Sequence, residues 1–308
     1  MANNVIQLNR QAYLGVAFAL IAAVGFSSKA ILVKLAYVDA VDPITLLTIR
    51  MVFSVPFFAG IALWSFTKKH ESPLERQDWF AILALGLVGY YLSSLLDFMG
   101  LQLISAGLER LILFLYPTMV VLISAVIFKR AIGPRELISL ALSYAGIGLV
   151  FLHDVSLYHG SIMLGAGMVF ASTLTYSTYL IGAGHAISRI GATRFTAYAM
   201  VVASSAVLFQ FGVTHPVSAL HLPLRVYELG MAMAIFSTVL PVFMLSAGIR
   251  MIGSGHVSLI GSIGPVTTIF LAHVFLNEAV STMQIAGSML VLAGVMAISL
   301  KKSGRATS

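Results

Sequence analysis

Long apolar runs separated by short polar segments follow one another along nearly the whole chain. A helix needs about 20 mainly apolar residues to cross a bilayer, and only helices and closed barrels can span one. A barrel would show short segments of alternating hydrophobicity instead of unbroken runs. The candidate helices are approximately Ala12–Leu35, Pro43–Phe66, Trp79–Leu101, Ser105–Phe128, Arg135–Leu152, Gly160–Ala183, Ala192–Val213, Val226–Ile249, Gly253–Leu276 and Val280–Leu300. The pattern therefore predicts an all-α integral membrane protein with ten transmembrane helices.

Composition agrees with a surface that faces lipid. Only 9% of the residues are charged and 59% are hydrophobic, with a mean hydropathy of +0.98, whereas soluble domains carry about a quarter charged residues. The absence of cysteine excludes disulfides, thiol catalysis and thiolate metal sites. The first run begins like a signal peptide, with Arg10 ahead of an Ala17-Phe18-Ala19 triplet, but it continues well past that triplet. We therefore expect it to be retained as a helix.

Basic residues are distributed unequally between the two ends of the predicted helices. If the ten helices alternate in direction, one side of the membrane holds Arg10, Lys68, Lys69, Arg76, Lys129, Arg130, Arg135, Arg189, Arg194, Arg250, Lys301, Lys302 and Arg305. The other side holds Arg225 together with Asp39, Asp42, Asp154 and Glu278. The positive-inside rule then predicts an inner (plasma) membrane protein with both termini in the cytoplasm. The net charge is +7, but the basic residues form no stripe with interleaved aromatics, so nucleic-acid binding is not indicated.

Part of the chain is repeated at an offset of 148 residues. The stretch Ser105–Phe128 is followed 148 residues later by a similar one that starts at Gly253, and Pro117 corresponds to Pro265. Further glycine matches occur at the same offset. The second copy has no counterpart of the charged pair Glu109-Arg110.

Each copy holds five of the predicted spans, an odd number, so the second copy must enter the membrane from the opposite face. We expect two inverted five-helix repeats at residues 12–152 and 160–300, between a cytoplasmic N-terminus at 1–11 and a cytoplasmic tail at 301–308. Inverted repeats of this kind are typical of secondary transporters, whose substrate site lies near the midplane where the repeats meet.

The motifs of the two copies resemble the drug/metabolite transporter superfamily, in its EamA-type form. The resemblance is carried by Gly25-Phe26-Ser27-Ser28, Lys34, Pro43, Arg50, Gly100-Leu101-Gln102-Leu103-Ile104-Ser105-Ala106 leading to Pro117, Gly248-Ile249-Arg250-Met251-Ile252-Gly253 leading to Pro265, and Phe275-Leu276-Asn277-Glu278. It implies secondary transport of small metabolites, often outward. The sequence departs from the family pattern at Phe26, where a Trp is usual, and at Phe128-Lys129-Arg130, which replaces an acidic turn.

Six charged residues within the predicted spans are candidates for the site, all of them in the first repeat: Lys29, Lys34, Arg50, Asp97, Glu109 and Arg110. A charge near the centre of a membrane helix costs about 2.5–3.5 kcal/mol on insertion scales, and such charges are functional candidates by default. Their formal sum is +2.

Lys29 lies near the middle of its span, where snorkelling is difficult, and is expected to face a central cavity. Lys34 is nearer the helix end and is expected to be an interface anchor. The guanidinium of Arg50 could bind a substrate carboxylate or phosphate in a bidentate manner. Alternatively, Arg50 forms a structural ion pair with Asp97 or Glu109.

Glu109, Leu113 and Tyr116 share one face of a continuous helix, which offers a carboxylate and a phenol to a substrate amine or to a proton. Glu109 and Arg110 could instead pair with other helices and form part of a gate. Asp97 is the candidate for proton coupling.

The second repeat contributes polar but uncharged side chains. Tyr176 is expected to line the cavity, since an aromatic ring with a polar tip suits organic solutes, and His256 is a further substrate-binding candidate. Pro117 and Pro265 are expected to bend their helices, either as static kinks or as flex points for alternating access.

No catalytic motif occurs: there is no H-E-x-x-H, no G-x-S-x-G, no phosphate-binding loop and no pair of carboxylates at a glycosidase-like spacing. We therefore expect no enzyme activity, no cofactor and no metal site. The pattern indicates neither the substrate nor the oligomeric state. It predicts a secondary transporter that exports small metabolites, such as amino acids or related compounds, by alternating access, with protons as the candidate coupling ion. The alternatives are an exchanger of carboxylated or phosphorylated anions, which the +2 sum favours, and an intramembrane enzyme.

Overall fold

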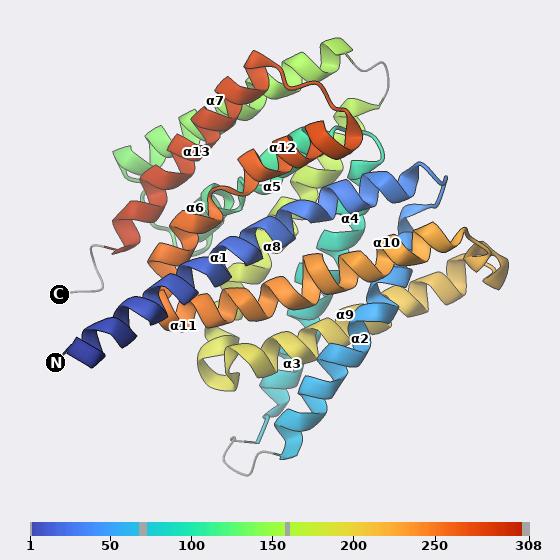
Figure 1. Ribbon diagram of the computed structural model, residues 1–308, viewed down its shortest axis with the longest axis horizontal. Coiled ribbons are helices and arrows are strands. Elements are labelled where there is room, and N and C mark those ends of the chain that lie inside the picture. The colour runs from blue at the N-terminus through green and yellow to red at the C-terminus, as the bar shows by residue number, and fades with distance from the viewer. Residues whose placement is uncertain (1, 68–72, 158–160, 304–308) are drawn as a thin grey trace.

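The computed structural model describes residues 2–67, 73–157 and 161–303, and these form helices joined by short turns (Figure 1). The elements are α1 (Ala2–Tyr37), α2 (Pro43–Thr67), α3 (Arg76–Gly86), η1 (Leu87–Leu92), α4 (Ser93–Leu101), α5 (Ala106–Leu113), α6 (Tyr116–Ile127), α7 (Pro134–Leu157), α8 (Ile162–Ile190), α9 (Ala192–Thr214), η2 (Val217–Leu220), α10 (Leu224–Ala234), η3 (Ile235–Val239), α11 (Leu240–Gly261), α12 (Gly264–Leu276) and α13 (Thr282–Ser303). No strand occurs among the described residues, so the all-α prediction is confirmed.

Eight helical stretches within the described residues are long and apolar enough to cross a membrane. They are Gln11–Tyr37, Pro43–Ser65, Arg76–Leu101, Ala106–Ile127, Pro134–Val155, Ala192–Thr214, Leu224–Gly253 and Leu259–Leu276. Helix α8 and the shorter apolar stretch Thr282–Ala297 lie where the sixth and tenth spans were expected. The protein is therefore a multi-pass membrane protein, and the count of ten spans stays a prediction.

Two predicted spans are interrupted rather than continuous. The helix expected from Ser105 is divided into α5 and α6 at Phe114 and Leu115. The corresponding span of the second copy starts at Gly253, where a φ of 79° breaks α11, and it is divided again between α11 and α12. The expectation of one helical face shared by Glu109 and Tyr116 is therefore wrong, because a break separates the two residues.

The prolines act at helix starts. Pro117 and Pro265 lie in the first turns of α6 and α12, where a missing N–H breaks no intrahelical hydrogen bond. The prediction that these prolines kink the interior of a helix is therefore wrong. Pro43 starts α2 in a similar way, and there the side chain of Asp42 accepts hydrogen bonds from the first-turn N–H groups.

Corresponding elements of the two copies begin 148 residues apart. This holds for α3 and α10, for α6 and α12, for α7 and α13, and for the π-helical segments η1 and η3. The turns after α6 and α12 also match, because Lys129 and Asn277 both have a left-handed backbone, with φ of 48° and 53°. A π segment and a left-handed turn residue are uncommon, so their recurrence at one offset shows one backbone plan used twice.

The two copies interleave, and most of the packing is between them. Helix α1 packs along α11 and α12, while its counterpart α8 packs along α4 and α6. Helix α2 packs on α9, and α7 lies beside α13 (Figure 1). The largest hydrophobic cluster fills the space among α1, α2, α4, α9 and α10 around buried side chains such as Leu47, Met51 and Phe98. The start of α1 and the end of α13 lie at the same end of the bundle (Figure 1).

Glycines allow α7 and α13 to approach closely. A Cβ on Gly146 would lie 2.5 Å from the carbonyl oxygen of Gly287, and at the symmetry-related contact a Cβ on Gly294 would lie 2.7 Å from the carbonyl oxygen of Ser139. The Ser139 hydroxyl also donates a hydrogen bond to the carbonyl oxygen of Gly294. Small residues of this kind hold membrane helices together because the apolar lipid offers no hydrophobic driving force between them.

We expect Gly146→Ala to lower the free energy of unfolding by about 1–3 kcal/mol, because the added methyl group meets backbone that cannot easily move. Gly148→Ala is the matched control in the same helix, since nothing lies within 4 Å of its Cβ position. It should be neutral or stabilising by up to about 1 kcal/mol, through helix propensity. Denaturant unfolding of the purified protein in detergent measures both, and equal effects of the two substitutions would contradict this account of the α7–α13 contact.

Candidate functional site

A buried ion cluster joins α1, α4 and α5. The Lys29 ammonium lies 2.5 Å from Oδ2 of Asp97 and 2.9 Å from Oε1 of Glu109. Glu109 is fully buried and Asp97 is 4% exposed. The structure thus brings together Lys29, Asp97 and Glu109, which we call the ion triad.

Local structure explains how the carboxylates reach Lys29. Glu109 lies in the first turn of α5, whose N-terminus is capped by the Ser105 hydroxyl accepting from the Leu108 N–H. Negative charge is favourable there because of the helix dipole. Asp97 lies in α4, immediately after the π segment η1.

The ion triad has more acceptors than donors. One ammonium faces two carboxylates, and Oδ1 of Asp97 and Oε2 of Glu109 are buried without a hydrogen-bond partner. A buried carboxylate without full compensation is costly in a medium of low polarity. The site is therefore able to take up a further cation, either a proton or an organic ammonium group.

Arg50 is not a partner of either carboxylate. Its Nε donates to Oγ1 of Thr238, 3.0 Å away, and its guanidinium lies over the ring of Phe98 at 5.5 Å from the centroid. Thr238 belongs to η3 and itself donates to the carbonyl of Met233. The structural ion pair that we considered for Arg50 is absent, and Lys29 is the cation that pairs with both carboxylates.

Arg110 follows Glu109 in α5 but reaches a different place. Its guanidinium lies against Gly264, the first residue of α12, and its Nε is buried without a hydrogen-bond partner. Tyr116 and Tyr176 are among its electrostatic neighbours. The rings of these two tyrosines pack edge to face at 5.9 Å.

The aromatic cluster continues along α8 from Tyr176 and reaches back to the first repeat at Tyr90. Tyr176 stacks on Tyr179 at 5.7 Å, and the hydroxyl groups of Tyr179 and Tyr90 are 2.9 Å apart. Tyr90 belongs to η1, so this π segment connects the aromatic cluster to the helix that carries Asp97. Tyr176 lies within the bundle, as expected for a wall residue, although no bound substrate tests that role.

Two serines donate hydrogen bonds to the first residues of the helices that follow the breaks. Ser27 of α1 donates to the carbonyl of Gly264 at 3.1 Å, and Ser177 of α8 donates to that of Tyr116 at 3.3 Å. Thr173 adds a hydrogen bond to the carbonyl of Ile112. Sequence reasoning missed Ser27 and Ser177 as partners of the breaks. The repeat could have identified them, because they occupy corresponding positions at an offset of 150 residues.

His256 lies apart from the other candidates. Its side chain is exposed, and its Nδ1 is 2.9 Å from the carbonyl oxygen of Ile252 in the same helix. The structure therefore does not bring His256 to the ion triad or to Arg110. Among the residues that the structure describes, no group of three or more His, Cys, Asp or Glu is arranged to hold a metal ion.

A second polar cluster lies at the start of α5. The Ser105 hydroxyl donates to Asp154 at 2.6 Å, and the Ala106 N–H donates to Oε1 of Glu278 at 3.1 Å. Burial raises the pKa of Glu278, and the hydrogen bond from Ala106 acts in the opposite direction. Lys34 is electrostatically close to Glu278. Through Glu278 the turn after α12 contacts the first repeat.

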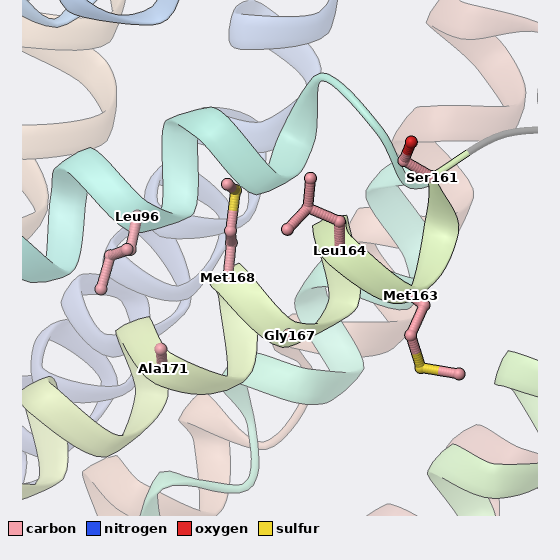
Figure 2. Close-up of a pocket in the computed structure, with 7 residues that line it drawn as sticks. All are labelled: Leu96, Ser161, Met163, Leu164, Gly167, Met168 and Ala171. Carbon is pink, nitrogen blue, oxygen red and sulfur yellow. The ribbon is translucent and has the colours of Figure 1, made fainter.

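The two surface hollows lie away from the ion triad. A groove of about 620 Å³ lies between α4 and the beginning of α8 (Figure 2). Its lining is almost entirely apolar, and Met163 and Leu164 are exposed, so the groove opens toward lipid. A small crevice is lined by Gly107 and Glu278. Neither hollow is lined by the ion triad, Arg50 or Arg110.

Known proteins with similar sequences are transporters by name. The chain is 30% identical over 289 residues to the uncharacterized transporter YcbK of Bacillus subtilis (strain 168), and the aligned region covers 90% of each protein. It is 26% identical over 252 residues to an S-adenosylmethionine/S-adenosylhomocysteine transporter of Chlamydia trachomatis serovar L2, covering 78% of this chain and 76% of that protein.

One crystal structure has the same fold, with a TM-score of 0.64 at 17% identity, covering 96% of this chain and 99% of that one. The EamA-like transporter family matches residues 13–152 and 163–300, which is nearly the whole chain in two consecutive units. The two units agree with the backbone plan used twice and with the interleaved helices. The chain belongs to the EamA-like transporter family.

Proposed function

We propose that this transporter exports small metabolites, such as amino acids or related compounds, by alternating access, and that the ion triad couples transport to protons. The observation that carries the proposal is the composition of the ion triad: two buried carboxylates share the ammonium of Lys29. Buried titratable groups in membrane spans are a usual component of proton relays and substrate pathways.

The triad provides a physical basis for competition between ligands. A proton bound by Asp97 or Glu109, or a substrate ammonium that contacts both, removes the excess negative charge and weakens the hold on Lys29. The charged or titratable groups that face these carboxylates are Lys29, Lys34, Tyr37, Arg50 and Arg110. Because one site binds either a proton or an amine, the two ligands would move in opposite directions.

Helix α1 connects this event to the second repeat. It carries Lys29, which binds the carboxylates of the first repeat, and Ser27, which binds the Gly264 carbonyl at the break between α11 and α12. Release of Lys29 would therefore free α1 to move relative to α4 and α5, as alternating access between inverted repeats requires.

The substrate class is supported by chemistry and by one relative. Carboxylates suit a substrate ammonium, and S-adenosylmethionine, the cargo named for the chlamydial relative, carries an amino-acid group. Export is supported by the family resemblance, whose members often transport outward. An anion exchanger is the second candidate, favoured by Arg110 and Arg50, neither of which has a carboxylate partner within the described chain.

Glu109→Gln and Asp97→Asn should each lower accumulation driven by a pH gradient by about tenfold, since coupling free energies are typically 1–3 kcal/mol. Exchange of labelled for unlabelled substrate without a gradient should persist, because the remaining carboxylate of the ion triad still contacts the substrate ammonium. Uptake of an amino-acid panel by proteoliposomes, with and without a pH gradient, measures both.

Glu228→Gln is the control for this pair, because Glu228 is an exposed carboxylate of α10. It should leave both activities unchanged. If transport by the native protein requires a counter-substrate and does not respond to the pH gradient, the anion exchanger is favoured instead.

We also propose that the protein lies in the plasma membrane with both termini in the cytoplasm, on the basis of the positive-inside rule. Ala131 and Ala279 provide a matched test, because they are exposed, occupy corresponding turns and are 148 residues apart. The chain has no native cysteine. An impermeant maleimide should label Ala279→Cys in intact cells and Ala131→Cys only in inside-out vesicles; the reverse pattern would overturn the orientation.

A further inference from the structure

Arg110 is a partly buried cation whose guanidinium forms no ion pair with a described residue, although Glu109 and Asp97 act on it electrostatically. Glu109 precedes it in α5 but faces Lys29 at 2.9 Å. Within the described chain no carboxylate pairs with the Arg110 guanidinium, and its buried Nε donates to nothing. A guanidinium inside a membrane bundle is costly without a partner, so an anion that is absent from the protein itself would complete this site.

Gly264 creates the space that the guanidinium occupies. A Cβ built on Gly264 would lie 2.7 Å from Nη2 of Arg110 and 3.5 Å from its Nε, so any larger residue would displace the side chain. Gly264 is also the first residue of α12, and the positive end of a helix dipole lies at its N-terminus. The Gly264 carbonyl is already engaged by Ser27, so it does not neutralise Arg110.

Two tyrosines add hydrogen-bond donors at the same place. Tyr116 and Tyr176 are electrostatic neighbours of Arg110, and their rings pack against each other. Neither hydroxyl group is hydrogen-bonded to a described residue. The site therefore combines a fork of guanidinium donors with two phenol donors, and no carboxylate within ion-pair distance of the guanidinium opposes an incoming anion.

We infer that Arg110, Tyr116, Tyr176 and Gly264 form an anion subsite that binds an oxyanion of the transported compound. The planar guanidinium matches the two oxygens of a carboxylate and also binds phosphate. This inference rests on the proposed transport function and names the acidic half of its substrate. Because Glu109 and Arg110 are neighbours in α5, a small zwitterion would place its ammonium at the ion triad and its carboxylate at the anion subsite.

The test measures the unfolding temperature of the purified full-length protein in detergent, with acetate, inorganic phosphate or chloride added at equal ionic strength. Acetate or phosphate should stabilise the native protein more than chloride does. A larger effect of acetate indicates a carboxylated substrate, and a larger effect of phosphate indicates a phosphorylated one. Equal effects of all three anions would overturn the inference.

Gly264→Ala should abolish the specific stabilisation, because its methyl group displaces the flexible end of Arg110 and leaves the backbone in place. Gly261→Ala is the matched control three residues earlier, since no atom lies within 4 Å of its Cβ position. It should keep the stabilisation. Retention of the effect in Gly264→Ala would overturn the subsite.

Arg110→Gln and Arg110→Lys separate binding from folding. Without added anion, Arg110→Gln should unfold at the native temperature or higher, because an unpaired buried charge is removed, and it should weaken anion binding about tenfold or more. Arg110→Lys, which keeps the charge but not the fork, should be intermediate. A lower unfolding temperature with unchanged anion binding would show a structural role only. If Arg110→Gln loses anion binding but keeps proton-driven transport, the subsite does not bind the transported compound, and this inference alone is refuted. If transport does not depend on protons, the proposed coupling is refuted instead.

Discussion

Water is excluded from the hydrocarbon region of a membrane, so every charge and every free carbonyl there must find its partner within the protein. The ion triad meets this requirement with Lys29 between Asp97 and Glu109. Next to the helix breaks, the hydroxyl groups of Ser27 and Ser177 donate to backbone carbonyls of the opposite repeat. Because α1 supplies both Lys29 and Ser27, this helix holds together the charged part of one repeat and the broken helix of the other. The same requirement singles out Arg110, whose Nε has no hydrogen-bond partner among the described residues.

Symmetry and chemistry are separable in this molecule. The two copies share their π segments, their breaks, their left-handed turn residues and their glycine contacts. The charges are not shared: at an offset of 150 residues, Lys29 corresponds to Tyr179, and at 148 residues Glu109 corresponds to Val257. Positions that are charged in the first repeat are thus occupied by uncharged residues, one aromatic and one aliphatic, in the second. A scaffold with matching halves can alternate between two faces while it carries a single, unsymmetrical site.

Much of the fold could be predicted from the sequence, because bilayer thickness determines the length of the apolar runs. The Pro117–Pro265 pair defines the offset of the repeat. The sequence did not predict which of the intramembrane charges form pairs. Arg50 was considered as a partner of Asp97 or Glu109, yet it binds Thr238, and Lys29 pairs with both carboxylates. His256 looked like a site residue by position along its helix, but the side chain faces outward. Such outcomes depend on how helices rotate about their axes, which apolar periodicity defines poorly when every face is apolar.

The π segment η1 has a consequence for the direction in which Asp97 points. A π turn contains one residue more than the α turn it replaces, and each residue of an α-helix turns the chain by about 100°. If η1 were an ordinary α-helix one residue shorter, everything after it in α4 would be rotated by roughly that angle. Asp97 would then turn away from α1 and toward a different neighbour. The orientation of the carboxylate is therefore encoded in the segment Leu87–Leu92, upstream of Asp97 itself.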